Sequence, residues 1–402
     1  MKKFLAWTAL LLGIASIVFF GVLPPIVEGR MNVVSGPQPP AATARAAALH
    51  KTLQVADMHA DTLMWKRDFM ARGARGQVDF PRLTEGNVAL QILSSVTKTP
   101  KNQNYDSNSG DTDNITLLTI AQGQPPRTWN SLIERSLWHA EKLHRAVAEA
   151  NGKLKEIRTK DDLDYLIYRR VGHSSKRGGL APCFHNCPPT PMGVLLSVEG
   201  LHDIEGKRAN LDRLYDAGFR MAGLAHFFDN EVAGSMHGVR KGGLTPFGVE
   251  IVRAMEAKGM VVDIAHCSHT CVAQVLAMAK RPVVSSHGGV QATCKVNRNL
   301  TDDEIRGVAR TGGVVGIGYW DAAVCDTSPK GIVRAIAHVR DLVGIDYVGL
   351  GSDFDGAVTT RFDTTRLDAI TQGLIDAGFS DADIAKVMGG NVFRVLAQVL
   401  PN

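Results

Sequence analysis

The sequence predicts an α/β protein, a single (β/α)8 barrel of the TIM type with a long insertion between strands 2 and 3, preceded by an N-terminal hydrophobic membrane segment. Short apolar runs alternate with longer helical patterns, which is typical of repeated βα units on a parallel sheet. The chain has 402 residues, enough for one elaborated barrel, which needs roughly 250. A composition of 45% hydrophobic and 21% charged residues is that of a folded globular protein.

An almost uncharged stretch runs from Phe4 to Val27, directly after two lysines. A helix of this length crosses a hydrocarbon core of roughly 30 Å, and the lysines favour a cytoplasmic N-terminus. We expect residues 1–30 to be a signal-anchor or a signal peptide rather than a buried helix of the fold. The remainder would face the periplasm from the bacterial inner membrane, or be exported after cleavage. An anchor is favoured because no clear cleavage site precedes Arg30, although the Ala-rich segment 40–48 could hold one.

Eight candidate strands end at polar residues or glycine. They end near His59, Ser94, Glu199, His226, His266, His287, Gly318 and Asp353. Buried parallel strands should be almost continuously apolar, and 193–197, 259–264 and 313–317 are. Helical spacing is present in the segments between strands at 210–218, 246–258, 271–280 and 330–343.

The predicted domain organisation is a linker over residues 31–50 and a barrel over 51–402. Residues 100–191 are too many for a simple crossover and are interpreted as an insertion on the barrel. Within the insertion, 129–150 is predicted as an amphipathic helix. The tail 380–400 is predicted as a closing helix pair, with Ser380 as an N-cap.

The net charge of +5 is modest and no basic run is present, so nucleic acid is not expected as a partner. The six cysteines can be oxidised in an exported chain. Cys183 and Cys187 could bind a metal together with His185, although a local disulfide or free thiols is favoured. The pairing of Cys267 and Cys271 is left open.

Five potential metal ligands fall at or just after predicted strand ends. His59 and Asp61 are two residues apart, so they lie on the same side of an extended strand and can reach one metal. Glu199, His266 and His287 each follow another apolar run. One such residue alone is more often a satisfied polar group. Because barrel enzymes build their sites at the carboxyl ends of the strands, all five in register predict a metal site.

The combination of these five residue types predicts a metal-dependent hydrolase. A carboxylate shared between two ions, surrounded by imidazoles and a second carboxylate, suits Zn²⁺ or a similar divalent metal. Two such ions can bind a bridging hydroxide and polarise a carbonyl. No Gly-x-Ser-x-Gly elbow, P-loop or dinucleotide fingerprint suggests another chemistry.

Over residues 55–396 the sequence resembles the membrane (renal) dipeptidase family, peptidase family M19, of the metal-dependent amidohydrolase-like barrels. The resemblance is carried by nine motifs in order along the chain. They are Asp57-Met-His-Ala-Asp-Thr-Leu, Asp79-Phe-Pro-Arg-Leu, Ser197-Val-Glu-Gly, Leu224-Ala-His, Gly243-Leu-Thr-Pro-Phe-Gly, Asp263-Ile-Ala-His, Pro282-Val-Val-Ser-Ser-His, Arg298-Asn-Leu-Thr-Asp-Asp and Gly349-Leu-Gly-Ser-Asp-Phe-Asp-Gly.

The resemblance implies two Zn²⁺ per chain, other divalent metals also being compatible. His59 and Asp61 would bind one ion, His266 and His287 the other, and Glu199 would bridge them. It thereby implies zinc-dependent hydrolysis of dipeptides by a binuclear centre with a bridging hydroxide nucleophile.

The resemblance also implies roles around the metals. His226 would contact the substrate and stabilise the oxyanion. Asp353, favoured over Asp355, would relay a proton from the water to the leaving amine. Arg298 would hold the substrate carboxylate, and Tyr319 lies where the family often places a substrate-contacting aromatic residue.

A disulfide between Cys294 and Cys325 is likewise implied by the resemblance. Two departures bear on the preferred dipeptide. Ala60 stands where the family commonly has Asn, and Phe-Phe-Asp at 227–229 replaces a polar run.

Three functions compete, of which a metallo-dipeptidase acting on a small peptide, membrane-bound through its N-terminal segment, is favoured. A related barrel hydrolase for another amide, ester or lactone is the alternative, and it would not need Arg298. A membrane-anchored binding or structural protein on a decayed barrel is disfavoured because all five ligands are present. The oligomeric state, including a homodimer, is left open.

Overall fold

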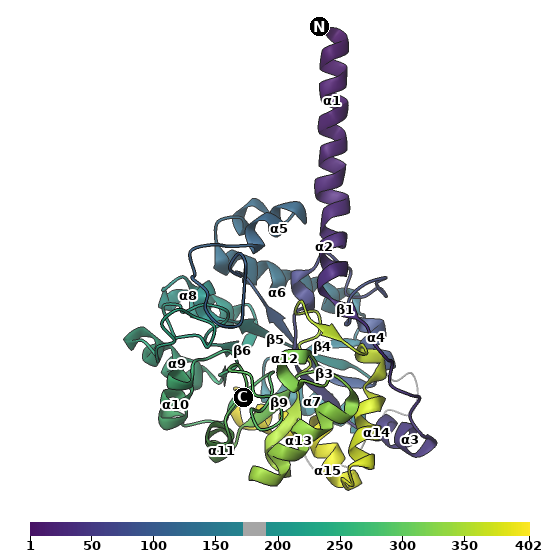
Figure 1. Ribbon diagram of the computed structural model, residues 1–402, viewed down its shortest axis with the longest axis vertical. Helices are drawn as coiled ribbons and strands as arrows, with labels where there is room; N and C mark the ends of the chain where they lie inside the picture. The colour runs from purple at the N-terminus through teal and green to yellow at the C-terminus, as the bar shows by residue number, and fades with distance from the viewer. Residues whose placement is uncertain (172–189) are drawn as a thin grey trace.

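The computed structural model describes residues 1–171 and 190–402. Its centre is a closed barrel of eight parallel strands, all of them buried (Figure 1). The strands are β2 (Val55–Ala60), β3 (Val88–Ser95), β5 (Met192–Glu199), β6 (Phe219–Gly223), β7 (Val261–Asp263), β8 (Val283–Ser285), β9 (Val314–Ile317) and β10 (Val348–Leu350). Pairing of β3 with β5 closes the ring, which confirms the predicted barrel.

The strand register brings the carboxyl ends of the strands to one face. In the β3–β5 pair, Ser94 lies opposite Ser197, and in the β5–β6 pair Glu199 lies opposite Gly223. Two short additions lie outside the ring. β4 (Leu154–Glu156) pairs with the start of β5, and β1 (Val33–Val34) pairs with β11 (Thr359–Thr360).

Amphipathic helices surround the barrel. Helix α9 (Pro246–Lys258) is typical, because Thr245 accepts a hydrogen bond from the Gly248 N–H at its start and Gly259 ends it with a φ of 72°. Others that cover the barrel or close the chain are α3 (Ala44–Thr52), α4 (Phe80–Glu85), α8 (Arg208–Asp216), α10 (His269–Met278), α11 (Asp302–Arg310), α12 (Asp321–Val324), α13 (Pro329–Val343), α14 (Asp368–Asp376), α15 (Asp381–Ala385) and α16 (Asn391–Val399). The expected helical segments between strands and the Ser380 N-cap agree with this arrangement.

The segment between β3 and β5 holds α5 (Ile115–Ala121), α6 (Leu132–Glu149), β4 and α7 (Lys160–Val171). Helix α6 agrees with the helix predicted within 129–150, and Ser131 caps its start by accepting from the Glu134 N–H. Cys183, His185 and Cys187, for which a local disulfide, free thiols or a metal site was considered, lie outside the described residues.

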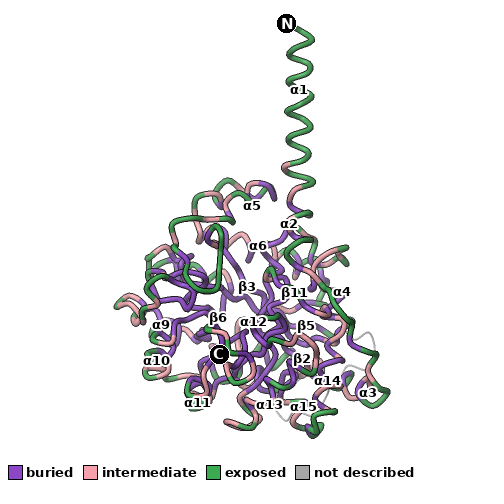
Figure 2. Tube along the Cα trace, in the orientation of Figure 1, coloured by how far each residue is buried: buried purple, intermediate pink, exposed green. Residues whose placement is uncertain are grey.

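The N-terminal segment is a nearly continuous helix from Lys2 to Met31, long and apolar enough to cross a membrane. It comprises α1 (Lys2–Ile17), a π-helical turn and α2 (Leu23–Met31). Figure 1 shows it projecting from the body, and Figure 2 shows that it is exposed along most of its length. Only its base is buried, at Pro24 and Glu28. The predicted boundaries at residues 30 and 50 stay predictions, and α3 already begins at Ala44.

Candidate active site

The five expected ligands meet at the carboxyl face of the barrel, around the carboxylate of Glu199. Its Oε1 atom lies 2.9 Å from His266 Nε2 and 3.2 Å from His287 Nε2. Its Oε2 atom lies 3.7 Å from His59 Nε2 and 3.5 Å from His226 Nε2. The two carboxylate oxygens of Glu199 therefore face two different sets of imidazoles.

Strand ends and tight loop conformations position these side chains. His59 belongs to β2 and Glu199 is the last residue of β5. His266 and Asp353 follow β7 and β10 in left-handed conformations, with φ of 63° and 61°. Non-glycine residues rarely adopt such angles unless the surrounding structure imposes them, and they concentrate at functional sites.

The donor set fits a divalent metal. His59, Asp61 and Glu199 offer ligand atoms within 4.8 Å of one another, as do Glu199, His226 and His266. The Nε2 atoms of His266 and His287 are 2.9 Å apart. Among the described residues, both ring nitrogens of His59 and one oxygen of Asp61 are buried without a hydrogen-bond partner. Buried polar atoms usually have partners, so these unpaired atoms favour a ligand that binds them.

The pKa directions of two of the histidines point the same way, whereas for His59 burial is outweighed by the charges of Asp61 and Glu199, which raise its pKa well above the usual range. Burial lowers the pKa of His266 and His287 well below its usual range, and the charge of Arg298 lowers both further. Neutral imidazole is the form that binds metals. Burial, with the nearby charges of Asp61 and Glu199, raises the pKa of Asp353 well above its usual range. A cation among these crowded groups would stabilise the carboxylates.

Two buried aspartates outside the predicted set of site residues, Asp57 and Asp263, brace the ligands. Asp57 accepts hydrogen bonds from the backbone N–H groups of His59 and Ser352. Asp263 accepts from the Ser286 hydroxyl, which also contacts His287 Nδ1 at 2.8 Å. Such partners orient metal-binding side chains. The sequence signal that could have identified these two aspartates is a charged residue inside an apolar strand.

The structure brings His226 and Arg298 to the cluster. His226 is buried beside Glu199. Arg298 is buried with one Nη 3.3 Å from His266 Nε2, and its guanidinium lies over the Trp320 ring. Tyr319, in contrast, packs between Phe354 and Phe362, and the adjacent Trp320 lines the cavity instead.

The two candidate aspartates of the loop after β10 have different environments. Asp353 lies 3.9 Å from His59 Nε2 and lines the cavity. Asp355 is fully buried, accepts from the hydroxyl of Thr62 and pairs with Arg67. Only Asp353 therefore faces the space in which a substrate would lie.

A cavity of about 520 Å³ opens from the cluster. Asp61, Glu199, His226, His266 and Asp353 line its end at the cluster. The remainder is mostly apolar, and it includes residues from α5 and from α2 of the N-terminal helix. The apolar part was not predicted, since nothing in the sequence places α2 beside the barrel face.

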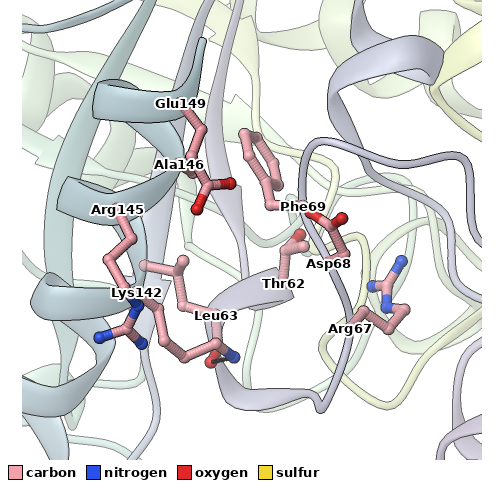
Figure 3. Close-up of a pocket in the computed structure, with 9 residues that line it drawn as sticks. All are labelled: Thr62, Leu63, Arg67, Asp68, Phe69, Lys142, Arg145, Ala146 and Glu149. Carbon is pink, nitrogen blue, oxygen red and sulfur yellow. Dashed lines mark hydrogen bonds between the residues drawn. The ribbon is translucent and has the colours of Figure 1, made fainter.

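A second pocket lies between α6 and the segment that follows Asp61 (Figure 3). Lys142 crosses it and donates to the carbonyl oxygens of Leu63 and Trp65, at 2.7 and 2.6 Å. Burial lowers the pKa of Lys142 to about 7. None of the five expected ligands lines this pocket. Its side chains therefore support the turn after Asp61 and do not belong to the cluster.

Cys294 and Cys325 are joined by a disulfide that links the loop after β8 to the end of α12. Cys267 and Cys271 are buried free thiols. The disulfide lies next to the Arg298 loop, since Asn299 donates to the Cys294 carbonyl.

Comparisons with known proteins agree with this geometry. The model of the membrane dipeptidase family (peptidase family M19) matches residues 189–401, more than half of the chain. Dipeptidase aclJ of Aspergillus oryzae is 29% identical over 364 residues, which cover 85% of this chain and 77% of aclJ. Dipeptidase verJ of Clonostachys rogersoniana is 34% identical over 215 residues, covering 52% of this chain and 55% of verJ.

Solved structures share the fold. The probable dipeptidase PvdM from Pseudomonas aeruginosa superposes with a TM-score of 0.71 at 19% identity, over 89% of this chain and 98% of PvdM. A metallo peptidase from Rhodobacter sphaeroides gives 0.68 at 20% identity, over 86% and 99%. With its buried cluster of metal-binding side chains, the chain belongs to the membrane dipeptidase family, peptidase family M19, and is a hydrolase of the metallo-dipeptidase class.

Proposed function

We propose that the protein hydrolyses dipeptides with two Zn²⁺ ions held by His59, Asp61, Glu199, His266 and His287. The observation that carries the proposal is the position of Glu199, whose two oxygens face His59 on one side and the His266–His287 pair on the other. Bound there, two ions would polarise the scissile carbonyl and supply a hydroxide nucleophile at neutral pH.

The side chains around the metals would each perform one step. Asp353 Oδ1 accepts the proton of the attacking water and passes it to the nitrogen of the leaving amine. His226, neutral because burial lowers its pKa, donates an N–H to the developing oxyanion. Arg298 holds the substrate carboxylate, and its proximity to His266 Nε2 supports that role. The ring of Trp320, which lines the cavity, lies beneath the guanidinium of Arg298 and so supports this arrangement.

The N-terminal helix acts as an uncleaved anchor in this proposal, with the barrel on the periplasmic side of a bacterial inner membrane. Glu28 supports retention of the helix, because it is buried and paired with Arg67 of the body. Loss of the helix would leave Arg67 with one carboxylate partner fewer.

The test is a metal-dependent assay on the full chain in detergent. The protein is stripped with a chelator, reloaded with zinc, and given L-Ala-L-Ala, L-Ala-D-Ala, a matched ester and a lactone. We expect dipeptide hydrolysis that follows metal content to two ions per chain. Glu199→Gln should abolish it, whereas Glu250→Gln, at an exposed site on α9, should not. Preferential turnover of the ester or lactone would favour the related hydrolase.

A further inference from the structure

The membrane-proximal helix forms part of the wall of the substrate cavity. Leu23, Val27 and Met31 line it, and their spacing of four residues places them on one face of α2. This face extends about 12 Å along the helix, at about 1.5 Å per residue. The cavity thus runs from the polar cluster to the helix that enters the membrane.

Helix α5, which contacts α2, supplies another apolar part of the wall. Ile115, Leu117 and Leu118 line the cavity, and Val27 of α2 packs with Ile115 in one small hydrophobic cluster. Figure 1 shows α5 beside the base of the N-terminal helix. Leu117 is nevertheless 59% exposed and Met31 is 40% exposed. Large apolar side chains left exposed together at a cavity usually mark a surface that an apolar ligand covers.

The helix is held in this position by contacts with the catalytic loop. Glu28 pairs with Arg67, which also pairs with Asp355. Asn32 Oδ1 accepts from the Ala357 N–H at 2.9 Å, and β1 pairs with β11 directly after it. The apolar wall is therefore fixed relative to Asp353.

The two ends of the cluster of predicted metal ligands differ in polarity. Met64 and Trp65 lie three and four residues after Asp61 and belong to the same hydrophobic cluster as Ile115. Arg298 lies at the other end, beside His266. A substrate with its carboxylate at Arg298 would place the acyl half of its scissile amide toward the apolar wall.

We propose that the preferred substrate is an amphiphilic amide that carries a long aliphatic chain on its acyl half and a carboxylate on its leaving half, and that the aliphatic chain lies along the cavity wall formed by α2 and α5. Because α2 continues into the membrane-crossing helix, the mouth of the cavity lies at the membrane surface, and the aliphatic chain reaches it from the lipid. This inference deepens the proposed dipeptidase function and rests on it.

The test uses the full chain in nanodiscs and a series of dipeptides with alanine as the leaving residue. The first residue is alanine, norleucine or a longer 2-aminoalkanoic acid. We expect kcat/KM to rise about two- to fourfold per added methylene until the wall is covered, mainly through KM. Leu117→Asn should flatten this rise, so that the ratio of kcat/KM for the longest member to kcat/KM for Ala-Ala falls toward one. Val239→Asn is the matched control, since Val239 is 64% exposed and does not line the cavity.

The outcomes separate this inference from the proposed function. Normal Ala-Ala hydrolysis with no rise along the series would overturn the inference and leave the dipeptidase function intact. A rise confined to members that partition into the bilayer, unchanged in Leu117→Asn, would mean that the membrane only concentrates substrate, which also overturns it. No hydrolysis of any member by zinc-loaded protein would refute both.

Discussion

Asp353 and Asp355 lie two residues apart in one loop, both buried and both with positive φ, yet they belong to two different regions. Asp353 joins the cluster of imidazoles and carboxylates at the barrel face. Asp355 joins an ion-pair network with Arg67, which also holds Glu28. In the cluster, carboxylates and imidazoles lie close together and few fixed cations are present. In the network, each carboxylate lies beside a guanidinium.

The buried charges of the cluster need a ligand to balance them, whereas the buried charges of the network stabilise the fold. Unpaired buried atoms are costly, so the cluster is stable only with a bound cation or shifted protonation. The network satisfies its charges internally. Substitutions in the cluster should therefore change activity, and those of the five proposed ligands should also change metal content, whereas substitutions in the network should change the free energy of unfolding.

The largest effect is expected from Glu199→Gln, which removes the negative charge between the two sets of imidazoles. Dipeptide hydrolysis should fall below detection and bound zinc should fall below two per chain, measured by elemental analysis. The thermal midpoint of the metal-free protein should not fall. Full zinc content with full activity would show that Glu199 is not a ligand.

Asp353→Asn should lower kcat by about 10²- to 10⁴-fold, because an amide cannot accept the proton of the attacking water. Zinc content and the circular dichroism spectrum should stay those of the wild type. Unchanged turnover would assign the proton relay to another group.

Arg67→Met should destabilise the fold by about 3–5 kcal/mol, since it leaves Asp355 buried without a cationic partner and Glu28 with only its 3.5 Å contact to Arg75. The measurement is urea-induced unfolding in detergent. Arg72→Met is the control, because its pair with Glu85 is exposed, and it should change stability little. Equal effects of the two substitutions would argue against the network.

Arg298→Ala should raise KM for dipeptides by about 10- to 100-fold, the loss of one hydrogen bond to a charged group. The same substitution should have a smaller effect on a dipeptide amide, which lacks the carboxylate. Steady-state kinetics on the matched pair of substrates measure the difference. An equal loss on both would mean that Arg298 acts through His266 instead.

The most gradual effect concerns Lys142, in the pocket behind the cluster. Burial lowers its pKa from 10.5 to about 7, so between these values the unfolded chain holds a proton that the folded protein has released. Stability should therefore rise with pH from about 7 to about 10.5, by up to about 1.4 kcal/mol per pH unit. Urea midpoints at pH 7 and 9 should show a rise that Lys142→Met abolishes and the exposed Lys153→Met retains.

Much of the catalytic face was predictable from the sequence. The eight strands and their order follow from apolar runs separated by helical spacing. His59, Glu199 and His287 could be grouped because parallel strands end at a common face. The bracing role of Asp263 was not predicted, since it depends on the hydroxyl of Ser286 reaching both Asp263 and His287.

Local sequence thus determined that this is a parallel barrel with metal-binding residues at one end, because strand period and apolar runs are encoded residue by residue. The tertiary structure decided which aspartate of the loop faces the cavity, and that Trp320 rather than Tyr319 lines it. It also placed Val27 of α2 against the cavity that opens from the cluster. These outcomes depend on contacts between segments distant in the chain, and packing sets such contacts when the barrel closes.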